Sequence, residues 1–210
     1  MLKLFYSPGA CSLAAHVALE EAGARYEIQL VDLKSGQQRS SDYLKVNPKG
    51  RVPALATERG ILTESPAILV YIAQRFPESD LAPLGDPFAF AEMQAFNVYL
   101  ASTVHVAFAH VFRASRYADG DVAAAAMKAK APEALDEAFA AIDARLSDGR
   151  PFVQGENYTV CDPYLMVFER WFTSGKLGHP ERFTHVRSHR ERVEARPAVR
   201  RVLAAEGLSA

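Results

Sequence analysis

Hydrophobic and polar positions follow two different patterns along this chain, and the change falls near residue 80. Before that point, short apolar runs that end at turn residues alternate with stretches of helix-forming residues. The first kind predicts strands and the second predicts helices. The predicted strands are Leu2–Tyr6, Tyr26–Val31, Ala54–Ala56 and Ile61–Thr63, and the predicted helices are Ser12–Ala22, Ser41–Val46 and Pro66–Phe76. This alternation indicates a small α/β domain.

Three prolines and a glycine within residues 76–87 predict a linker. After it the pattern is helical, without a strand signal. Asp86 can cap a helix that begins at Pro87 and runs to about Phe112, and its broadly apolar sequence predicts a central, buried position. Further helices are predicted over Asp121–Ser147, from Thr159 onward, over Arg182–Ala195 and over Pro197–Ala205. We expect residues 1–80 to form one domain, 81–87 the linker and 88–210 an all-helical domain.

Two of these helices carry further local signals. Pro132 should kink the helix over 121–147, and Asp148 with Gly149 should end it. Thr159 is expected as the N-cap of the next helix, with Asp162 three residues on as the acidic variant of a capping box.

The composition is that of an ordinary soluble protein, with 49% hydrophobic and 23% charged residues among 210. The formal net charge of −1 gives no sign of a nucleic-acid or membrane partner. No stretch approaches the roughly 18 uninterrupted apolar residues of a membrane span, and no secretory signal is visible at the N-terminus. Cys11 and Cys161 do not make a disulfide framework. We therefore expect a reducing, cytoplasmic location.

Cys11 is the first candidate for chemistry. It follows the Leu2–Tyr6 strand and the turn Ser7–Ala10, and it opens the first predicted helix. Unpaired backbone N–H groups and the helix dipole favour negative charge at that position, so we expect a lowered thiol pKa and an available thiolate. A small buried core residue is the alternative.

The segment Asn47–Leu55 is the second candidate. Pro53 lies at the entry to a strand, where proline is tolerated. A cis peptide bond there would leave the N–H and C=O groups of Val52 free to pair with an extended peptide. A plain trans turn is the alternative.

The segment Thr63–Ile68 is the third. Ser65 is a good N-cap and Pro66 a favoured first helical residue. Such a helix start can bind a carboxylate, and Glu64 can pair with an ammonium group. The alternative is an ordinary helix start with a solvated glutamate. Together, however, a thiolate, a backbone edge and a clamp for an α-amino acid match the chemistry of glutathione.

Five segments of the chain resemble the bacterial beta class of glutathione transferases over essentially its whole length. They are S-P-G-A-C-S at 7–12, N-P-K-G-R-V-P-A-L at 47–55, T-E-S-P-A-I at 63–68, T-V-C-D at 159–162 and A-E-G-L at 205–208. The resemblance implies a thioredoxin-like N-terminal domain, an all-helical C-terminal domain and a homodimer. It also implies a cis peptide bond before Pro53 and a Cys11 thiol able to form a mixed disulfide with glutathione.

The resemblance also implies roles in the helical domain. His105 matches a histidine that faces the glutathione sulfur, where an imidazole could donate a hydrogen bond to a thiolate or shuttle a proton. The alternative is a histidine that is satisfied inside the helical bundle, or an exposed one. Phe108 and Phe112 share its helical face, and Trp171 matches a family aromatic. These three are expected to line a pocket for the second substrate; membership of the core is the alternative.

The chain departs from the family pattern in three places. Val106 stands where the family often has lysine, and a family lysine that holds the glycine carboxylate of glutathione falls near Gly36. Lys34 or Arg51 can substitute for it. A family asparagine that reaches the partner subunit's glutathione falls near Val98, one residue from Asn97.

We expect an enzyme that directs the thiolate of glutathione, its co-substrate, at a small hydrophobic electrophile. Ser12 and the helix start near Cys11 would stabilise this thiolate together with His105, and no metal is expected. Cys11 can also exchange with a glutathionylated disulfide, whereas Ala14 in place of a second cysteine argues against thioredoxin-like dithiol exchange. The alternative is a non-catalytic binding or regulatory protein of the same fold.

Overall fold

The computed structural model of the protein describes residues 1–175 and 177–209 and contains a four-stranded sheet at the N-terminal end. Its strands are β1 (Leu2–Tyr6), β2 (Tyr26–Leu30), β3 (Ala54–Thr57) and β4 (Gly60–Thr63). They lie in the order β2-β1-β3-β4. β1 pairs with β2 in parallel, and β3 is antiparallel to both β1 and β4. The predicted strands are confirmed to within one residue at each end.

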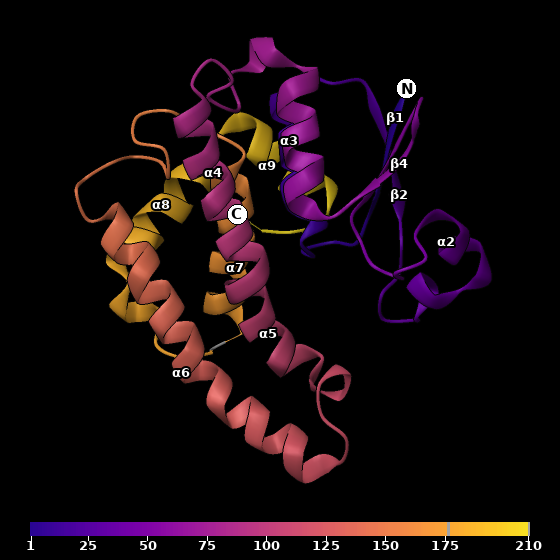
Figure 1. The fold of residues 1–210 in the computed structure, drawn as a ribbon, viewed down its shortest axis with the longest axis vertical. Helices are drawn as coiled ribbons and strands as arrows, with labels where there is room; N and C mark the ends of the chain where they lie inside the picture. Colours follow the sequence, from indigo (N-terminus) through magenta and orange to yellow (C-terminus); the bar gives the residue numbers. More distant parts are fainter. Residues whose placement is uncertain (176, 210) are drawn as a thin grey trace.

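Three helices cover this sheet: α1 (Ser12–Glu21), α2 (Ser41–Val46) and α3 (Ser65–Arg75). α1 packs against α3 and against the later helices α7 and α9. Figure 1 shows α3 between the sheet and the helical part of the molecule, while α2 lies on the outer side. A small separate core of Val31, Tyr43 and Val52 fills the α2 side. The motif that holds Val52 is thus packed independently of the main core.

The helical domain begins with one continuous helical run whose geometry changes midway. α4 (Pro87–Tyr99) leads into a π-helical turn over Leu100–Val104 and then into α5 (His105–Phe112). Asp86 caps the start as predicted, because its Oδ1 accepts from the backbone N–H groups of Phe88 and Ala89 at 2.9 and 3.1 Å. The π turn, which the sequence did not predict, rotates the helix immediately before His105.

By length and composition alone, the run Pro87–Phe112 is long and apolar enough to cross a membrane, with a mean hydropathy of 1.3. In this structure it is a helix of the helical domain. Met93, Leu100, Val104 and Phe108 belong to the main core, while Phe88 and Val98 face outward with 74% and 53% of their surface exposed.

The remaining helices are α6 (Asp121–Leu146), α7 (Cys161–Ser174), α8 (Thr184–Glu194) and α9 (Pro197–Ala205), and short 3₁₀ turns cover Gln37–Arg39, Pro77–Ser79, Ala114–Arg116 and Pro180–Arg182. α6 extends away from the rest at its N-terminal end (Figure 1). Pro132 lies inside α6. One connected hydrophobic core runs from Leu4 and Leu13 in the first domain to Leu135 and Phe168 in the second. The predicted architecture, a small α/β domain followed by an all-helical domain, is confirmed.

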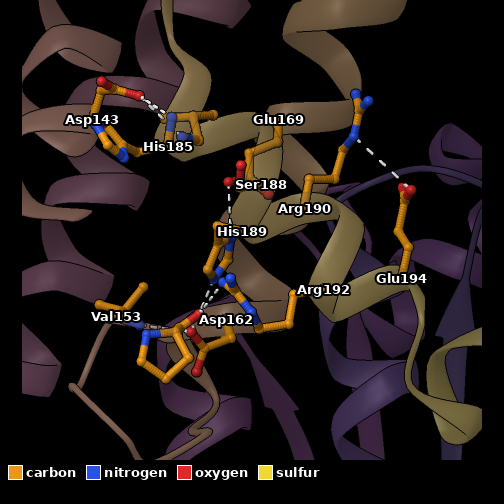
Figure 2. Close-up of polar contacts among 12 residues, drawn as sticks. Asp143, Val153, Asp162, Glu169, His185, Ser188, His189, Arg190, Arg192 and Glu194 are labelled. Carbon is orange, nitrogen blue, oxygen red and sulfur yellow. Dashed lines mark hydrogen bonds and ion pairs between the residues drawn. The ribbon is translucent and has the colours of Figure 1, made fainter. Parts of the chain in front are cut away.

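A buried ionic cluster fixes α7 to α8 (Figure 2). His189 lies between two carboxylates, with Nδ1 2.9 Å from Glu169 Oε1 and Nε2 3.0 Å from Asp162 Oδ1. All three side chains are at most 1% exposed. Asp162 also accepts the backbone N–H groups of Thr159 and Val153 at 2.7 and 2.8 Å. The predicted contact between Thr159 and Asp162 is therefore present, but the N-cap position of α7 is held by Val160 and not by Thr159. A histidine from α8 extends the contact.

Candidate active site

Cys11 stands at the predicted junction between the β1 turn and the start of α1, at the N-cap position. Its Sγ lies 3.3 Å from the Val52 carbonyl oxygen, to which the thiol donates a hydrogen bond. Burial raises the pKa of the Cys11 thiol to about 11, and the nearby Ser65 hydroxyl offsets only part of that rise. The expected lowering of the Cys11 pKa is therefore wrong, since loss of hydration outweighs the effect of the helix N-terminus.

The Val52–Pro53 peptide bond is cis, as the resemblance implied. Two side chains brace the residue before it: the Tyr43 hydroxyl and the Asn47 amide each donate to the Arg51 carbonyl oxygen at 2.7 Å. The segment is thereby held rigidly beside Cys11. A cis turn was expected to leave the Val52 C=O group unpaired. Instead, its oxygen accepts a hydrogen bond from the Cys11 thiol.

Glu64 and Ser65 lie at the start of α3, in a different arrangement from the one predicted. Glu64 takes the cap position with a φ of 73°, and Ser65 is the first helical residue. The prediction of Ser65 as N-cap is therefore wrong, because the chain turns one residue earlier. Ser65 is buried, with its hydroxyl near the Cys11 sulfur. The Glu64 carboxylate, in contrast, lies at the surface.

Lys49 is a site residue that the sequence reasoning missed. Its ammonium group lies 2.6 Å from Glu64 Oε1 and donates to Thr63 Oγ1 at 3.0 Å. Both charged side chains are more than half exposed. Glu64 therefore already holds an ammonium group of the kind expected from glutathione. Lys49 stood inside the quoted 47–55 segment, but its pairing across 15 positions had no sequence signal.

The Ser12 side chain does not reach the site as expected. Ser12 is fully buried, and its hydroxyl bonds the backbone of Ser7 on both sides, accepting at 3.1 Å and donating at 3.2 Å. The Ser12 hydroxyl is thus wrongly assigned to glutathione. Lys34 lies exposed in the turn after β2, where its backbone N–H donates to Asp32, and its expected contact with the glycine carboxylate stays a prediction. The positive charge of Arg51 acts on both Cys11 and His105 and lowers the pKa of each group.

His105 follows the π turn and lies partly buried among aromatic rings. Its ring centroid is 5.3 Å from that of Trp171 and 5.5 Å from that of Phe168. Burial, and after it the charges of Arg51 and Arg116, lower the pKa of His105 to about 4. The imidazole is therefore neutral near pH 7, with one nitrogen able to donate and the other able to accept.

The three predicted pocket aromatics lie together, with different exposures. Phe108 stacks on Phe112 at a centroid distance of 6.1 Å, and both contact Trp171, at 5.4 and 6.3 Å. Phe108 is fully buried, so its assignment to the pocket lining is wrong and it supports the other two from behind. Phe112 is 48% exposed and Trp171 partly exposed.

Residues from the far end of the chain anchor the Cys11 loop. The Trp171 indole N–H donates to the Gly9 carbonyl oxygen at 2.7 Å, and Glu206 Oε2 accepts the Gly9 N–H at 2.9 Å. His16 Nδ1 lies 2.8 Å from the other Glu206 oxygen, and this pair is buried. Glu206 belongs to the closing A-E-G-L segment, but no sequence spacing reveals its contact with Gly9.

Other features lie outside this cluster. Cys161 is fully buried with its Sγ 3.4 Å from the Met93 carbonyl oxygen, and burial followed by the Asp162 charge raises its pKa well above the usual value. Two cavities of about 530 and 330 Å³ border α4 and α6 around Glu92 and Arg145 and share no residue with the Cys11 site. Within residues 1–175 and 177–209, no group of three His, Cys, Asp or Glu side chains is placed to hold a metal ion.

Comparison with known proteins defines the class. The family model described as "Glutathione S-transferase, N-terminal domain" matches residues 1–74, and the corresponding C-terminal domain model matches residues 99–197. Glutathione S-transferase GstA of Escherichia coli O157:H7 is 36% identical over 210 residues, which cover 99% of this chain and 100% of that protein.

Solved structures agree. A glutathione transferase homolog from Sulfitobacter with bound glutathione has a TM-score of 0.92 and 37% sequence identity to this chain. The match covers 100% of this chain and 99% of the Sulfitobacter chain. The bacterial beta class glutathione S-transferase of Sphingomonas chungbukensis has a TM-score of 0.86 and 36% sequence identity to this chain. The match covers 99% of this chain and 100% of the Sphingomonas chain.

The chain belongs to the glutathione S-transferase family. Within that family it is of the bacterial beta-class type, with a thioredoxin-like first domain and a helical second domain, and it is a glutathione transferase.

Proposed function

We propose that this protein binds glutathione across the Cys11 loop, Val52 and the start of α3, and directs its thiolate at an electrophilic carbon. The observation that carries the proposal is the meeting of the Cys11 thiol, the Val52 carbonyl and the Ser65 hydroxyl at one point. The cysteinyl backbone of glutathione would pair with Val52, and its γ-glutamyl end would lie on Glu64 and Ser65. Arg51 would approach its glycine carboxylate.

In the conjugation reaction the glutathione sulfur forms a C–S bond as the C–halogen bond of an aryl halide breaks and halide leaves. The thiol proton passes to solvent. A neutral His105 can donate a hydrogen bond to the developing thiolate without itself carrying charge. Phe112 and Trp171 would cover the apolar part of the electrophile.

We propose a second, redox activity for Cys11. Its thiolate attacks a glutathionylated disulfide, so that a Cys11–glutathione disulfide forms and the substrate thiolate leaves. A second glutathione thiolate then attacks this mixed disulfide, releases Cys11 and forms glutathione disulfide. Both electrons therefore come from glutathione. Cys161 is buried away from this chemistry, and Ala14 stands where a resolving cysteine would be.

We also propose a homodimer and a cytoplasmic location. Phe88 and Val98 are exposed apolar side chains of α4, and α4 also lines the 330 Å³ cavity that it forms with α6. A second copy of this chain is the occupant that we propose, since Ile61 on β4 offers a further exposed apolar side chain. Two free thiols, Cys11 and Cys161, fit a reducing compartment.

The test is turnover of 1-chloro-2,4-dinitrobenzene with glutathione, together with reduction of a glutathionylated disulfide. We expect both activities in the wild type. Cys11→Ala should lose the second activity entirely and the first only in part, because the nucleophile in conjugation is the sulfur of glutathione itself. Neither activity, combined with retention on immobilised glutathione, would favour the non-catalytic alternative. Neither activity nor retention would refute the proposed function.

A further inference from the structure

One buried carboxylate contacts the chain on both sides of Cys11. Glu206 Oε2 accepts the backbone N–H of Gly9, two residues before the cysteine, at 2.9 Å. Its Oε1 lies 2.8 Å from Nδ1 of His16, five residues after the cysteine and inside α1. The Glu206 side chain is fully shielded from solvent, and that of His16 is 3% exposed. Glu206 therefore ties the turn that precedes Cys11 to the helix that follows it.

Gly9 has further contacts with the helical domain. The Trp171 indole N–H donates to the Gly9 carbonyl oxygen at 2.7 Å. The Leu208 side chain lies above the same residue, with Cδ2 3.7 Å from the position that a Cβ on Gly9 would take. Gly9 has a φ of 67°, a left-handed conformation that glycine adopts without strain. Both backbone polar groups of Gly9 are thus bonded to side chains from the far end of the chain.

Hydrogen bonds within the first domain hold the ends of the same turn. The Ser12 hydroxyl accepts the Ser7 N–H at 3.1 Å and donates to the Ser7 carbonyl oxygen at 3.2 Å. These bonds fix Ser7 relative to Ser12. The direction of the backbone at Gly9, which lies between them, is set by Glu206 and Trp171.

The docking of α9 on α1 has other contacts besides Glu206. Apolar side chains of α9 belong to the main core, Arg196 pairs with Glu21 at 2.6 Å and Arg201 pairs with Glu20 at 2.6 Å. A buried carboxylate costs free energy unless hydrogen bonds replace its hydration, and a buried ion pair often adds less stability than apolar packing would. What Glu206 supplies beyond helix packing is therefore its pair of contacts around the cysteine.

We propose that Glu206 is a positioning residue for the chemistry of Cys11: acting through Gly9 and His16, it fixes the strand-to-helix junction that holds the Cys11 sulfur on Val52. The inference rests on the proposed thiol exchange at Cys11. The cysteine sulfur must meet the sulfur of a bound disulfide in line, and a misplacement of about 1 Å can cost about 100-fold in rate. Glu206 sets the place of the nucleophile and does not itself contact glutathione.

Glu206→Leu tests this role, because it removes both hydrogen bonds and leaves an apolar side chain in the core. Its kcat for reduction of a glutathionylated disulfide should fall at least about tenfold. The KM for glutathione should stay unchanged, because Val52, Glu64 and Ser65 keep their places. Without glutathione, alkylation of the Cys11 peptide by iodoacetamide at pH 8 should rise at least about tenfold, since a relaxed turn admits water to the sulfur and lowers the pKa of the thiol.

Arg201→Gln is the matched control. It breaks the Arg201–Glu20 pair between the same two helices and removes no contact with the cysteine turn, so both measurements should remain those of the wild type. Glu206→Gln is the conservative variant. Its amide oxygen can accept the Gly9 N–H, and its NH₂ group can donate to Nδ1 of a neutral His16. It should therefore retain most of the wild-type kcat.

A folded Glu206→Leu with wild-type alkylation and kcat would overturn the proposal. So would an equal change in Arg201→Gln, which would make the effect a general loosening of α9, or an equal loss in Glu206→Gln, which would show that the two hydrogen bonds are not its cause. Far-UV circular dichroism before each assay establishes that the variants are folded.

Trp171→Phe keeps the test open if Glu206→Leu does not fold. It removes the donor to the Gly9 carbonyl oxygen and should also accelerate alkylation of Cys11, and an unchanged rate would refute the role of the Gly9 contacts. Alkylation does not depend on turnover. If the wild type reduces no glutathionylated disulfide but alkylation still separates Glu206→Leu from Arg201→Gln, the redox activity fails as a function and the positioning of Cys11 by Glu206 stands.

Discussion

The Cys11 thiol donates to the carbonyl oxygen of Val52 across 3.3 Å, and this is the same carbonyl that glutathione's backbone is proposed to use. Burial raises the pKa of the thiol to about 11, so the thiol is protonated at neutral pH. A carbonyl oxygen has two acceptor lone pairs, so Val52 could accept the Cys11 thiol and the backbone N–H of glutathione together. The reactive residue and the proposed docking edge are thus joined at one oxygen atom.

The raised pKa predicts slow alkylation of Cys11 at neutral pH when no glutathione is added. The rate with iodoacetamide should climb as the pH approaches 11, well beyond the usual thiol pKa of about 8.5. Subtracting the rate of Cys11→Ser removes any contribution from Cys161. Oxidised glutathione should add one glutathione per subunit, located on Cys11 by peptide mapping. Rapid alkylation with a midpoint below pH 8, or an adduct on Cys161, would contradict this assignment.

Glu64→Gln should weaken glutathione binding by about 1.5–3 kcal/mol, the worth of a hydrogen bond to a charged group. Titration calorimetry measures this directly. Glu58→Gln, an equal charge change on the exposed β3–β4 turn, is the control and should bind as the wild type does. Lys49 is paired with the Glu64 carboxylate, so Lys49→Gln shows how this pair affects glutathione binding. Tighter binding would mean that Lys49 competes with the ammonium group of glutathione, and weaker binding that Lys49 holds Glu64 in place. An unchanged dissociation constant in Glu64→Gln would remove Glu64 from the site.

His105 should titrate far below neutral pH. Burial and then the charges of Arg51 and Arg116 disfavour its imidazolium form and lower its pKa to about 4. The ring therefore stays neutral from about pH 5 upward, and kcat/KM should show no inflection between pH 6 and 7 from this residue. NMR titration of the ring protons measures the midpoint. Arg116→Gln should move it upward, and a wild-type midpoint near 6.5 would contradict the prediction.

His189→Gln should destabilise the fold by about 3–5 kcal/mol, because it leaves two buried carboxylates without their cation. Burial lowers the pKa of His189, but Glu169 and Asp162 outweigh it and raise the pKa to about 10. A folded pKa above the unfolded value of about 6.5 means that this stabilisation is complete below about pH 6.5 and is lost as the pH rises through about 10.

Urea unfolding of wild type and His189→Gln at several pH values tests this stabilisation. The difference in free energy of unfolding should be largest below about pH 6.5 and shrink toward pH 10. His185→Gln, on the exposed side of the same helix, is the control. A difference that is constant with pH would show that His189 contributes by packing alone.

Light scattering at micromolar concentration tests the proposed homodimer. We expect a mass of twice 23.1 kDa. Phe88→Glu and Val98→Glu should lower the mass, because each buries a charge in the apolar surface of α4, whereas Val122→Glu, on the exposed start of α6, should not. A wild-type mass near 23.1 kDa would refute the dimer.

The sequence predicted the fold well because its signals were local. Strand alternation, the Asp86 cap and the Thr159–Asp162 contact each depend on neighbouring residues. The site was predicted only in part, since its assembly depends on contacts between distant residues. The pairing of Lys49 with Glu64 spans 15 positions, and that of Gly9 with Glu206 spans 197.

Burial was the second quantity that the sequence could not supply. The same helix start that favours a Cys11 thiolate is enclosed enough to reverse the direction of its pKa shift. Ser12 and Phe108 have suitable chemistry at suitable positions, but both are fully buried. The spacing that placed them near the site gave no information on which atoms solvent or substrate can reach.

Gly9, two residues before Cys11, has both its N–H and its C=O bonded to the helical domain, through Glu206 and Trp171. The turn that carries Cys11 is therefore held by residues 162 and 197 positions later in the sequence. A chain truncated before Glu206 would carry Cys11 in a turn that has lost one of these two contacts. The geometry of the Cys11 turn thus depends on residues outside the thioredoxin-like domain.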